Sequence, residues 1–513
     1  MIRSARRCFP QRGSPGFELR PASLGNLDPP KFALRKHSLV LFKVKVELNL
    51  NKMKQILLIP LAVTVATINS HAFNPVVQTI YTADPAPVVQ DGVCYLYTDH
   101  DEDVLVNNFF TMKDWRCFTT TDMVNWTDHG VVASLRNFKW ADPKISGWGG
   151  FENGAWALQT IERDGKWYMY CPLQGRGIGV LVADNPFGPF TDPIGKPLIG
   201  GKYDSIDPTV FVDDDSQAYL CWGNPRCWYV KLNKDMISYD TSIGDHGLVV
   251  QDMTVEAFGK RSKSDPQHPT TYEEGPWLYK RNGLYYLIYA AGPISEHIGY
   301  STNSSPTGPW KYGGVVMPTE GRSFTDHPGV VDYKGKTYLF YHNGGLPGGG
   351  GFHRSVCVDE MKFNPDGSIV QMTMTKEGAA AVATLNPYQR VEAETIAWES
   401  GVKTAKSDAV GVYVTEIHDG AYIEVRNVDF GSKGATSFLA SIASPSEGGA
   451  IELRLDSLTG ELIGTLKVTP SGAWDKWETQ SCNVSDAKGV HDLFLKFTGG
   501  SGPLLNFDWW KFE

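Results

Sequence analysis

The segment 83–101 reads ADPAPVVQDGVCYLYTDHD, in which an acidic residue precedes a short apolar run, the pair Asp91-Gly92 and an aromatic-rich run. Asp-Gly between two alternating apolar runs is typical of a β-hairpin. Four further segments repeat this plan. They are GAWALQTIERDGKWYMYCP (154–172), IDPTVFVDDDSQAYLCWG (206–223), EGPWLYKRNGLYYLIYAAG (274–292) and DHPGVVDYKGKTYLFYHNGG (326–345).

One residue near the start of each segment serves as a marker of the repeat. The markers are Asp84, Trp156, Asp207, Glu274 and His327, with steps of 72, 51, 67 and 53 residues. Steps of this length fit four-stranded blades, so five of them predict a five-bladed β-propeller. Because the first strand of each blade begins at the central channel, we expect the markers to converge at one end of that channel.

A second β region follows the repeats. Short alternating runs, separated by Gly, Ser and Asp turns, include AYIEV (421–425), AIELRL (450–455) and HDLFLKF (491–497). This pattern is typical of a β-sandwich. The sequence therefore predicts an all-β protein, with a propeller over 73–380 and a β-sandwich (jelly-roll) module over 388–513.

The N-terminal part is basic and differs from the rest. Residues 1–52 carry 11 Lys/Arg against three acidic residues, so the net charge of −9 becomes −17 for the remainder. From Met53 the chain reads MKQILLIPLAVTVATINSHA, which indicates a signal peptide over 53–72 and an exported product, secreted, periplasmic or at the cell surface. We expect residues 1–52 to precede the true start of translation, the alternative being a disordered extension.

Composition excludes several classes of protein. With 53 Gly, 31 Pro and 12% aromatic residues in 513, the chain does not resemble a helical bundle. The acidic main body argues against a nucleic-acid partner, and the 13-residue apolar run of the signal peptide is shorter than a membrane span of about 20 residues. The cysteines after residue 72 are seven in number and irregularly spaced, so we expect buried free thiols, with Cys221 and Cys227 as the one candidate pair.

Three of the five markers are carboxylic acids, namely Asp84, Asp207 and Glu274. Hydrolysis of a glycosidic bond needs one carboxylic acid that protonates the leaving oxygen and one carboxylate that activates water or attacks the sugar. An exported, aromatic-rich protein with several acids at one channel mouth is suited to that reaction.

Residues 74–375 resemble the catalytic domain of glycoside hydrolase family 43. The matching motifs are ADP (83–85), SIDPTVFVDDD (205–215), EGPW (274–277), TDHPGVVDYKGKTYLFYHN (325–343) and HRSVCVDEM (353–361), with weaker matches in TTTDMVNWTDHG (119–130) and DNPFGPFTDPIGKPLI (184–199). The resemblance implies that Asp84 is the general base and Glu274 the general acid, while Asp207 orients the acid and raises its pKa. Glu273 is the alternative acid.

The same resemblance implies an inverting reaction, which requires the acid and the base to stand roughly 6.5–9.5 Å apart. It also implies that Arg354 contacts the sugar hydroxyls, the alternative being a structural salt bridge. Trp156 is expected to be a sugar platform, although Trp156-Ala157-Leu158 departs from the family's usual Trp-Ala-Pro, and the alternative is packing within the blade. His327 would contact substrate or, through water, a calcium ion in the channel, the alternative being a buried structural histidine. No organic cofactor is expected.

Residues 388–513 resemble carbohydrate-binding module family 6 through VEAE (391–394), GAWDKW (472–477) and NFDWWKF (506–512). The resemblance implies a structural calcium site at Glu392, Glu394 and Asp508 and a sugar site at Tyr413, Trp474 and Asn506. A purely structural sandwich is the alternative. The remaining tryptophans of these motifs are expected in the core, namely Trp477, Trp509 and Trp510.

The resemblances predict a secreted inverting glycosidase that releases α-L-arabinofuranosyl or β-D-xylosyl units from plant cell-wall polysaccharide. Its substrates would be arabinoxylan, arabinan or xylan oligosaccharides, and the protein is expected to be a monomer. Two alternatives stay open. One is an endo-acting arabinanase on the same fold, and the other is a non-catalytic carbohydrate-binding propeller.

Overall fold

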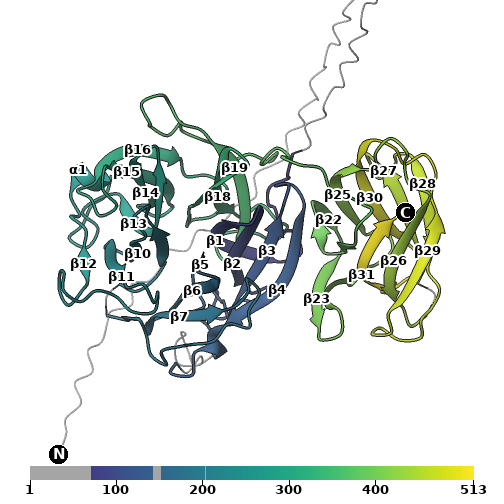
Figure 1. Ribbon diagram of the computed structural model, residues 1–513, viewed down its shortest axis with the longest axis horizontal. Coiled ribbons are helices and arrows are strands. Elements are labelled where there is room, and N and C mark those ends of the chain that lie inside the picture. Colours follow the sequence, from purple (N-terminus) through teal and green to yellow (C-terminus); the bar gives the residue numbers. More distant parts are fainter. Residues whose placement is uncertain (1–70, 142–151, 203, 447) are drawn as a thin grey trace, which may run out of the picture. The chain divides into compact units, whose positions relative to one another are not determined.

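The structure is a computed structural model, and it describes residues 71–141, 152–202, 204–446 and 448–513 (Figure 1). The predictions for residues 1–52 and for most of the signal peptide, 53–70, lie outside the described residues. Ala72, at which the predicted signal peptide ends, is 1% exposed, and its backbone N–H donates to the carbonyl of Ala379 at 2.7 Å. The described fold therefore begins slightly before the predicted cleavage point.

Among the described residues, the first part of the chain forms five antiparallel sheets in succession, purple to green in Figure 1. The first two sheets contain β1 (Tyr81–Gln90), β2 (Val93–Asp101), β3 (Asp114–Thr120), β4 (Trp126–Ser134), β5 (Gln159–Arg163), β6 (Lys166–Leu173), β7 (Gly177–Ala183) and β8 (Ile199–Gly200). The third contains β9 (Thr209–Val212), β10 (Ala218–Trp222), β11 (Trp228–Leu232) and β12 (Val249–Val250). The last two contain β13 (Tyr272–Arg281), β14 (Leu284–Ala291), β15 (His297–Asn303), β16 (Lys311–Met317), β17 (Gly329–Tyr333), β18 (Lys336–Asn343) and β19 (Ser355–Met361).

These five sheets are the blades of a five-bladed β-propeller, so the fold-class prediction is confirmed. Strand order within each blade follows the sequence, and the fifth blade has three strands, β17 to β19. Helical segments in the described part are short: η1 spans Leu135–Asn137 and α1 spans Val255–Phe258.

The predicted hairpin turns explain how each blade begins. Gln90 pairs with Val93 across Asp91-Gly92, where φ is +50° and +77°. Positive φ at both central residues matches the right-handed twist of the flanking strands. Similar pairs of positive φ values occur at Asp164-Gly165, Asn282-Gly283 and Lys334-Gly335, each between the first two strands of its blade.

The second β region consists mainly of two further sheets, green to yellow in Figure 1. One contains β22 (Trp398–Ser400), β25 (Tyr422–Asp429), β30 (Val490–Thr498), β27 (Ala450–Leu455) and β28 (Leu462–Lys467). The other contains β20 (Val391–Glu392), β23 (Lys403–Ser407), β24 (Gly411–Thr415), β31 (Asn506–Phe512), β26 (Ser437–Ala443) and β29 (Glu478–Asn483). Strand β21 (Thr395–Ile396) instead pairs with β4, so a piece of this region extends the sheet of the first blade.

Each β region has its own apolar core. Trp115 and Tyr341 are among the fully buried side chains of the propeller, and Trp510 and Phe512 are among those of the sandwich. The seven described cysteines are all free, so Cys221 and Cys227 form no disulfide.

Candidate active site

One cavity of about 510 Å³ contains most of the predicted propeller residues. It is lined by Asp84, Phe109, Phe110, Met112, Trp156, Ile206, Asp207, Asn224, Glu274, Ile294, Phe324, Thr325, Phe352 and Arg354. The three acids, Trp156 and Arg354 thus meet at one site although 270 residues separate the first from the last. His327 lies just behind the cavity, with its Nδ1 3.9 Å from Oδ1 of Asp84.

The backbone at the three acids is irregular. Asp84 and Asp207 have φ values of +50° and +52°, in the left-handed region that is uncommon for residues other than glycine. The pairing of β1 with β2 shifts register between Ala83 and Ala86, and that of β13 with β14 shifts on both sides of Glu274. Bulges of this kind re-aim side chains and are frequent next to active sites. Local backbone geometry therefore turns each acid out of the regular strand pattern.

Asp84 is 7% exposed and is surrounded by positive or neutral donors. Arg354 Nη1 donates to both of its oxygens, at 2.9 and 3.1 Å, and Nδ1 of His342 lies 3.3 Å from Oδ1. Burial by itself would raise the pKa of this carboxyl, but the Arg354 charge and the His342 contact hold the pKa well below its usual range. Asp84 is therefore ionised at neutral pH.

Arg354 is held in turn by a second aspartate. Its Nε and Nη2 donate to the two oxygens of Asp101, both at 2.9 Å, which is a bidentate pair. Asp99 lies 3.6 Å from Nη2, and both of its oxygens are buried without a hydrogen-bond partner. Burial and the Asp84 charge raise the pKa of Asp99 well above its usual range, so we infer that Asp99 is neutral beside the ionised Asp84.

Glu274 has the opposite electrostatic setting. Burial raises its pKa to about 7, the hydrogen bond from Asn224 opposes this rise, and the charges of Asp84 and Glu273 add to it. Asp207 is not among the main causes, although the sequence interpretation gave it that role. Glu273, the alternative acid, pairs with Arg261 and His268 and does not line the cavity. The geometry thus favours Glu274 as the acid.

Asp207 connects the third and fourth blades. Its Oδ2 accepts a hydrogen bond at 3.1 Å from the backbone N–H of Gly275, the residue after Glu274. Burial and the neighbouring charges of Glu274 and Asp84 raise the pKa of Asp207 well above its usual range. Asp207 is therefore placed to orient the strand end that carries Glu274.

Gly275 and His327 pack closely together next to the acids. Gly275 has a φ of +56°, and a Cβ there would lie 2.9 Å from Nδ1 of His327, so only glycine fits without displacement. Burial lowers the pKa of His327 to about 4, which leaves the imidazole neutral at neutral pH. Nearby, Oε1 of Glu296 is buried and has no hydrogen-bond partner among the described residues. Burial raises the pKa of Glu296 well above its usual range, so this carboxyl group is neutral like the imidazole, and both would contact a calcium ion only through the water molecules around it.

Four phenylalanines of the cavity lining, Phe109, Phe110, Phe324 and Phe352, form a connected aromatic wall. The ring centroids of Phe352 lie 4.8 Å from Phe110, 4.9 Å from Phe324 and 5.5 Å from Phe109. Arg354 lies 4.7 Å from the Phe110 ring. The cavity therefore presents both charged groups and apolar ring surfaces. This combination suits a sugar, which has polar edges and apolar faces.

Sequence reasoning missed several of these residues. Asp99 and Asp101 could have been found, because alternate residues of a strand share a face and both follow an aromatic-rich run. His342, Asn224 and the phenylalanines carry no comparable signal. His342 lies on β18, the middle strand of the fifth blade, whereas Asn224 and the phenylalanines lie in segments between the strands, and only the closure of the propeller brings them to the acids.

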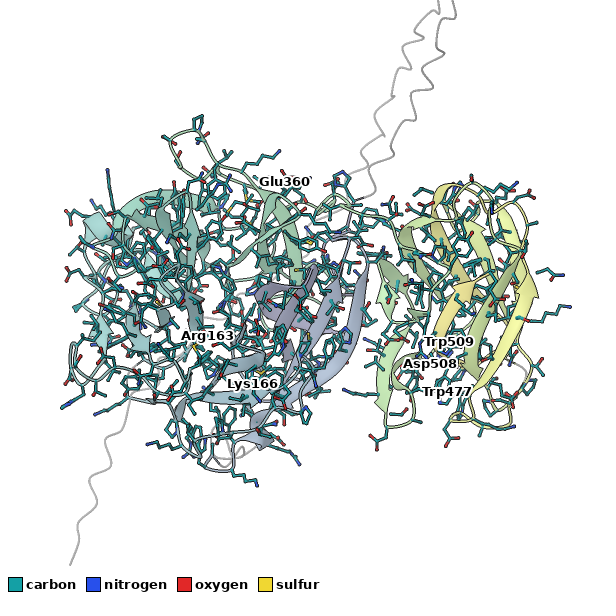
Figure 2. The ribbon with its side chains drawn as sticks, viewed as in Figure 1. Arg163, Lys166, Glu360, Trp477, Asp508 and Trp509 are labelled. Atoms are coloured by element: carbon teal, nitrogen blue, oxygen red, sulfur yellow. The ribbon has the colours of Figure 1, made fainter. Side chains whose placement is uncertain are left out.

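The predicted sugar residues of the C-terminal module are arranged differently from the expectation. Tyr413 contacts Trp477, with ring centroids 5.2 Å apart. Trp477, labelled in the C-terminal module in Figure 2, is half-buried, so the prediction that it belongs to the core is wrong. Trp474 is 41% exposed, and its carbonyl accepts a hydrogen bond from Nδ2 of Asn506 at 2.8 Å. Trp509 is also half-buried, whereas Trp510 is fully buried as predicted.

The predicted calcium residues of the module do not fit that ion as they stand. Nη2 of Arg390 lies 2.7 Å from Glu392 and 3.3 Å from Asp508, so a guanidinium already bridges these two carboxylates. Glu394 has a buried oxygen without a hydrogen-bond partner, and burial raises its pKa to about 9. A protonated Glu394 and an arginine between the other two acids are a poor set of calcium ligands.

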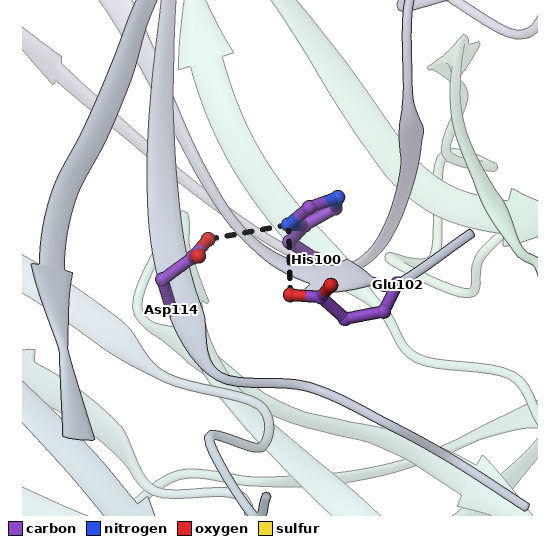
Figure 3. A group of neighbouring side chains, drawn as sticks. All are labelled: His100, Glu102 and Asp114. Atoms are coloured by element: carbon purple, nitrogen blue, oxygen red, sulfur yellow. Dashed lines mark hydrogen bonds and ion pairs between the residues drawn. The ribbon is translucent and has the colours of Figure 1, made fainter. Parts of the chain in front are cut away.

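A different group of metal-ligand type lies at the edge of the first blade (Figure 3). Nδ1 of His100 lies 3.3 Å from Asp114 and 3.9 Å from Glu102. Lys113 also binds Glu102, at 3.0 Å. The contacts are those of a surface ion-pair group, and no ligand is assigned to it.

Comparison with known proteins agrees with this architecture. Residues 72–369 match the model of glycosyl hydrolases family 43, and residues 392–513 match that of carbohydrate binding module family 6. The fold and the paired acids define a glycoside hydrolase. The chain belongs to glycosyl hydrolases family 43.

Several relatives are similar over most of their length. An arabinoxylan arabinofuranohydrolase of Bacillus subtilis (strain 168) is 36% identical over 510 residues, which covers 88% of this chain and 94% of that protein. A xylosidase/arabinosidase of Bacteroides ovatus is 33% identical, covering 56% of this chain and 94% of the relative. The solved structure of a family 43 arabinoxylan arabinofuranohydrolase from B. subtilis with cellotetraose has a TM-score of 0.72 at 34% identity, covering 86% of this chain and 97% of that one.

The described residues include no helix that is long and apolar enough to cross a membrane.

Proposed function

We propose that this protein is an inverting α-L-arabinofuranosidase that removes arabinofuranosyl side groups from arabinoxylan, and that it acts outside the cytoplasm. One observation carries the proposal: a single cavity holds Asp84, whose pKa is lowered, and Glu274, whose pKa is raised to about 7. Two carboxyl groups with pKa values displaced in opposite directions are the pair that acid–base catalysis at neutral pH requires.

In the reaction, a water molecule held by Asp84 attacks the anomeric carbon from the face opposite the leaving group. Asp84 accepts a proton from that water, the bond from the anomeric carbon to the glycosidic oxygen breaks, and Glu274 donates its proton to that oxygen. Asp207 holds the Glu274 backbone through Gly275. Arg354 keeps Asp84 ionised, and Trp156 with the phenylalanine wall packs against the sugar.

The substrate assignment rests on two relatives that are 36% and 34% identical and cover 88% and 86% of this chain; both are arabinoxylan arabinofuranohydrolases. The C-terminal module would bind the polysaccharide, with Tyr413 and Trp477 as the ring pair. His327 and Glu296 would hold the water molecules around a calcium ion, which would supply positive charge that orders the channel without taking part in proton transfer.

The test compares wild type and Glu274→Gln on 4-nitrophenyl α-L-arabinofuranoside and on arabinoxylan, with the released sugar identified and its anomeric form followed by NMR. We expect β-configured arabinose as the first product of the wild type and a loss of roughly 10²–10⁴-fold in activity on arabinoxylan for the variant. Equal inactivity of both proteins on every arabinoside and xyloside would support a non-catalytic propeller. Release of internal arabinan fragments would support an endo-arabinanase.

A further inference from the structure

Among the described residues that line the cavity, Asn224 is the one side-chain amide, and it forms a hydrogen bond with Glu274. Its Nδ2 lies 2.6 Å from Oε2 of Glu274, a short hydrogen bond between side chains 50 residues apart in the sequence. The residue belongs to the turn between β10 and β11, in the blade before the one that carries Glu274. The contact therefore depends on the packing of two blades against each other.

The turn that carries Asn224 is fixed at its preceding residue. The backbone N–H of Gly223 donates to the carbonyl of Ile206 at 3.0 Å, and the hydroxyl of Tyr272 donates to the carbonyl of Gly223 at 2.7 Å. Ile206 precedes Asp207, and Tyr272 is two residues before Glu274. The backbone just before Asn224 is thus bonded to the residue that precedes Asp207 and to a side chain two residues before Glu274, which fixes the turn relative to both acids.

The chemistry of the bond is directional. An amide N–H can only donate, so Oε2 of Glu274 must accept, and the proton of the neutral carboxyl group then sits on Oε1. In the proposed reaction, Oε1 is then the oxygen that protonates the leaving group. We propose that Asn224 is a positioning residue that selects which oxygen of Glu274 carries the catalytic proton. This inference rests on the proposed role of Glu274 as general acid.

The same bond has an electrostatic effect that agrees with the proposal. A donor to a carboxylate favours its charged form, and the Asn224 bond opposes the rise that burial imposes on the Glu274 pKa. Without the amide, the proton can occupy either oxygen and the acid is weaker. Protonation of a poor leaving group should then slow, whereas a leaving group that needs no proton should depart as before.

The experiment uses Asn224→Ala and a series of aryl α-L-arabinofuranosides with 2,4-dinitrophenol, 4-nitrophenol and phenol as leaving groups, together with arabinoxylan. We expect kcat to fall roughly 10- to 100-fold on the phenyl glycoside and on arabinoxylan but less than about threefold on the dinitrophenyl glycoside. The alkaline limb of the kcat/KM profile should move to higher pH. Asn224→Asp should also move it upward, because a carboxylate beside Glu274 disfavours its ionisation.

Two controls separate the possible causes. Asn233→Ala removes an exposed amide of the same blade that bonds to Ser238 at 2.8 Å, and it should leave all rates and the pH profile unchanged. Glu274→Gln tests the proposed acid itself. If Glu274→Gln remains active on arabinoxylan, the proposed function fails. If that variant is inactive, two results for Asn224→Ala would overturn only the inference about Asn224. One is an equal fall in kcat on all the aryl glycosides, and the other is an unchanged alkaline limb of the kcat/KM profile.

Discussion

This chain has two predicted sugar sites, the propeller cavity and the module surface. They differ in how far their main side chains are exposed to water. In the cavity, Asp84 and Asp207 are 7% and 5% exposed; burial raises the pKa of Asp207, whereas the Arg354 charge and the His342 contact overcome the effect of burial on the pKa of Asp84. In the module, Trp474 is 41% exposed and the Tyr413–Trp477 pair is half-buried. Proton transfer needs charges shielded from water, whereas ring stacking on a polymer needs accessible faces.

The largest expected effect comes from removing the base of the cavity. Asp84→Asn keeps the shape of the side chain but cannot accept a proton from water, so activity on arabinoxylan should fall by roughly 10²–10⁴-fold or more. Hydrolysis followed by reducing-sugar release checks this. Binding of the polymer measured in a pull-down should stay unchanged, and retention of more than a tenth of the activity would contradict the role given to Asp84.

The next effect concerns the charge that keeps Asp84 ionised. Arg354→Gln removes the guanidinium that pairs with the buried carboxyl groups of Asp84 and Asp101, which should lower the free energy of unfolding by about 3–5 kcal/mol. In molecules that fold, the acidic limb of kcat/KM should move to higher pH, because the pKa of Asp84 is no longer held down. Urea denaturation and a pH series measure the two effects. Arg354→Lys, which keeps one charge, should show a smaller shift of the limb.

The pH profile of the wild type follows from the opposite protonation states in the cavity. Glu274 must be protonated, so kcat/KM should fall by about tenfold per pH unit as the pH rises through about 7. Asp84 must be ionised, and its lowered pKa places the acidic limb below the usual range of an aspartate. Glu274→Gln should abolish the alkaline limb, and an alkaline limb that survives in this variant would refute the assignment.

The smallest effect is expected at the module. Trp477→Ala removes the ring that contacts Tyr413 at 5.2 Å, and it should weaken binding to insoluble arabinoxylan several-fold, since one stacked ring contributes about 0.5–1.5 kcal/mol. Rates on 4-nitrophenyl arabinofuranoside should change less than rates on the polymer. Trp474→Ala should weaken binding less than Trp477→Ala, and the reverse order would restore Trp474 to the role that the sequence pattern suggested.

The sequence predicted the propeller well because short local patterns are enough to predict the hairpin of each blade. Turn pairs such as Asp91-Gly92 and alternating apolar runs recur five times, and each predicts a hairpin without reference to the rest of the chain. The module was predicted less completely. Its strands followed from alternation, but the choice between Trp474 and Trp477 depended on which ring the loop turns toward Tyr413.

What the amino-acid sequence determined by itself was the repeat, the acids at the blade starts and the family motifs, since all of these depend on neighbours in the chain. The tertiary structure alone decided which groups touch the acids. Arg354 reaches Asp84 across 270 residues, Asn224 reaches Glu274 across 50, and Arg390 reaches Asp508 across 118. Such contacts arise only when distant parts of the chain pack against one another, and the pKa values that make two chemically similar carboxyls act as an acid and a base are set only at that point.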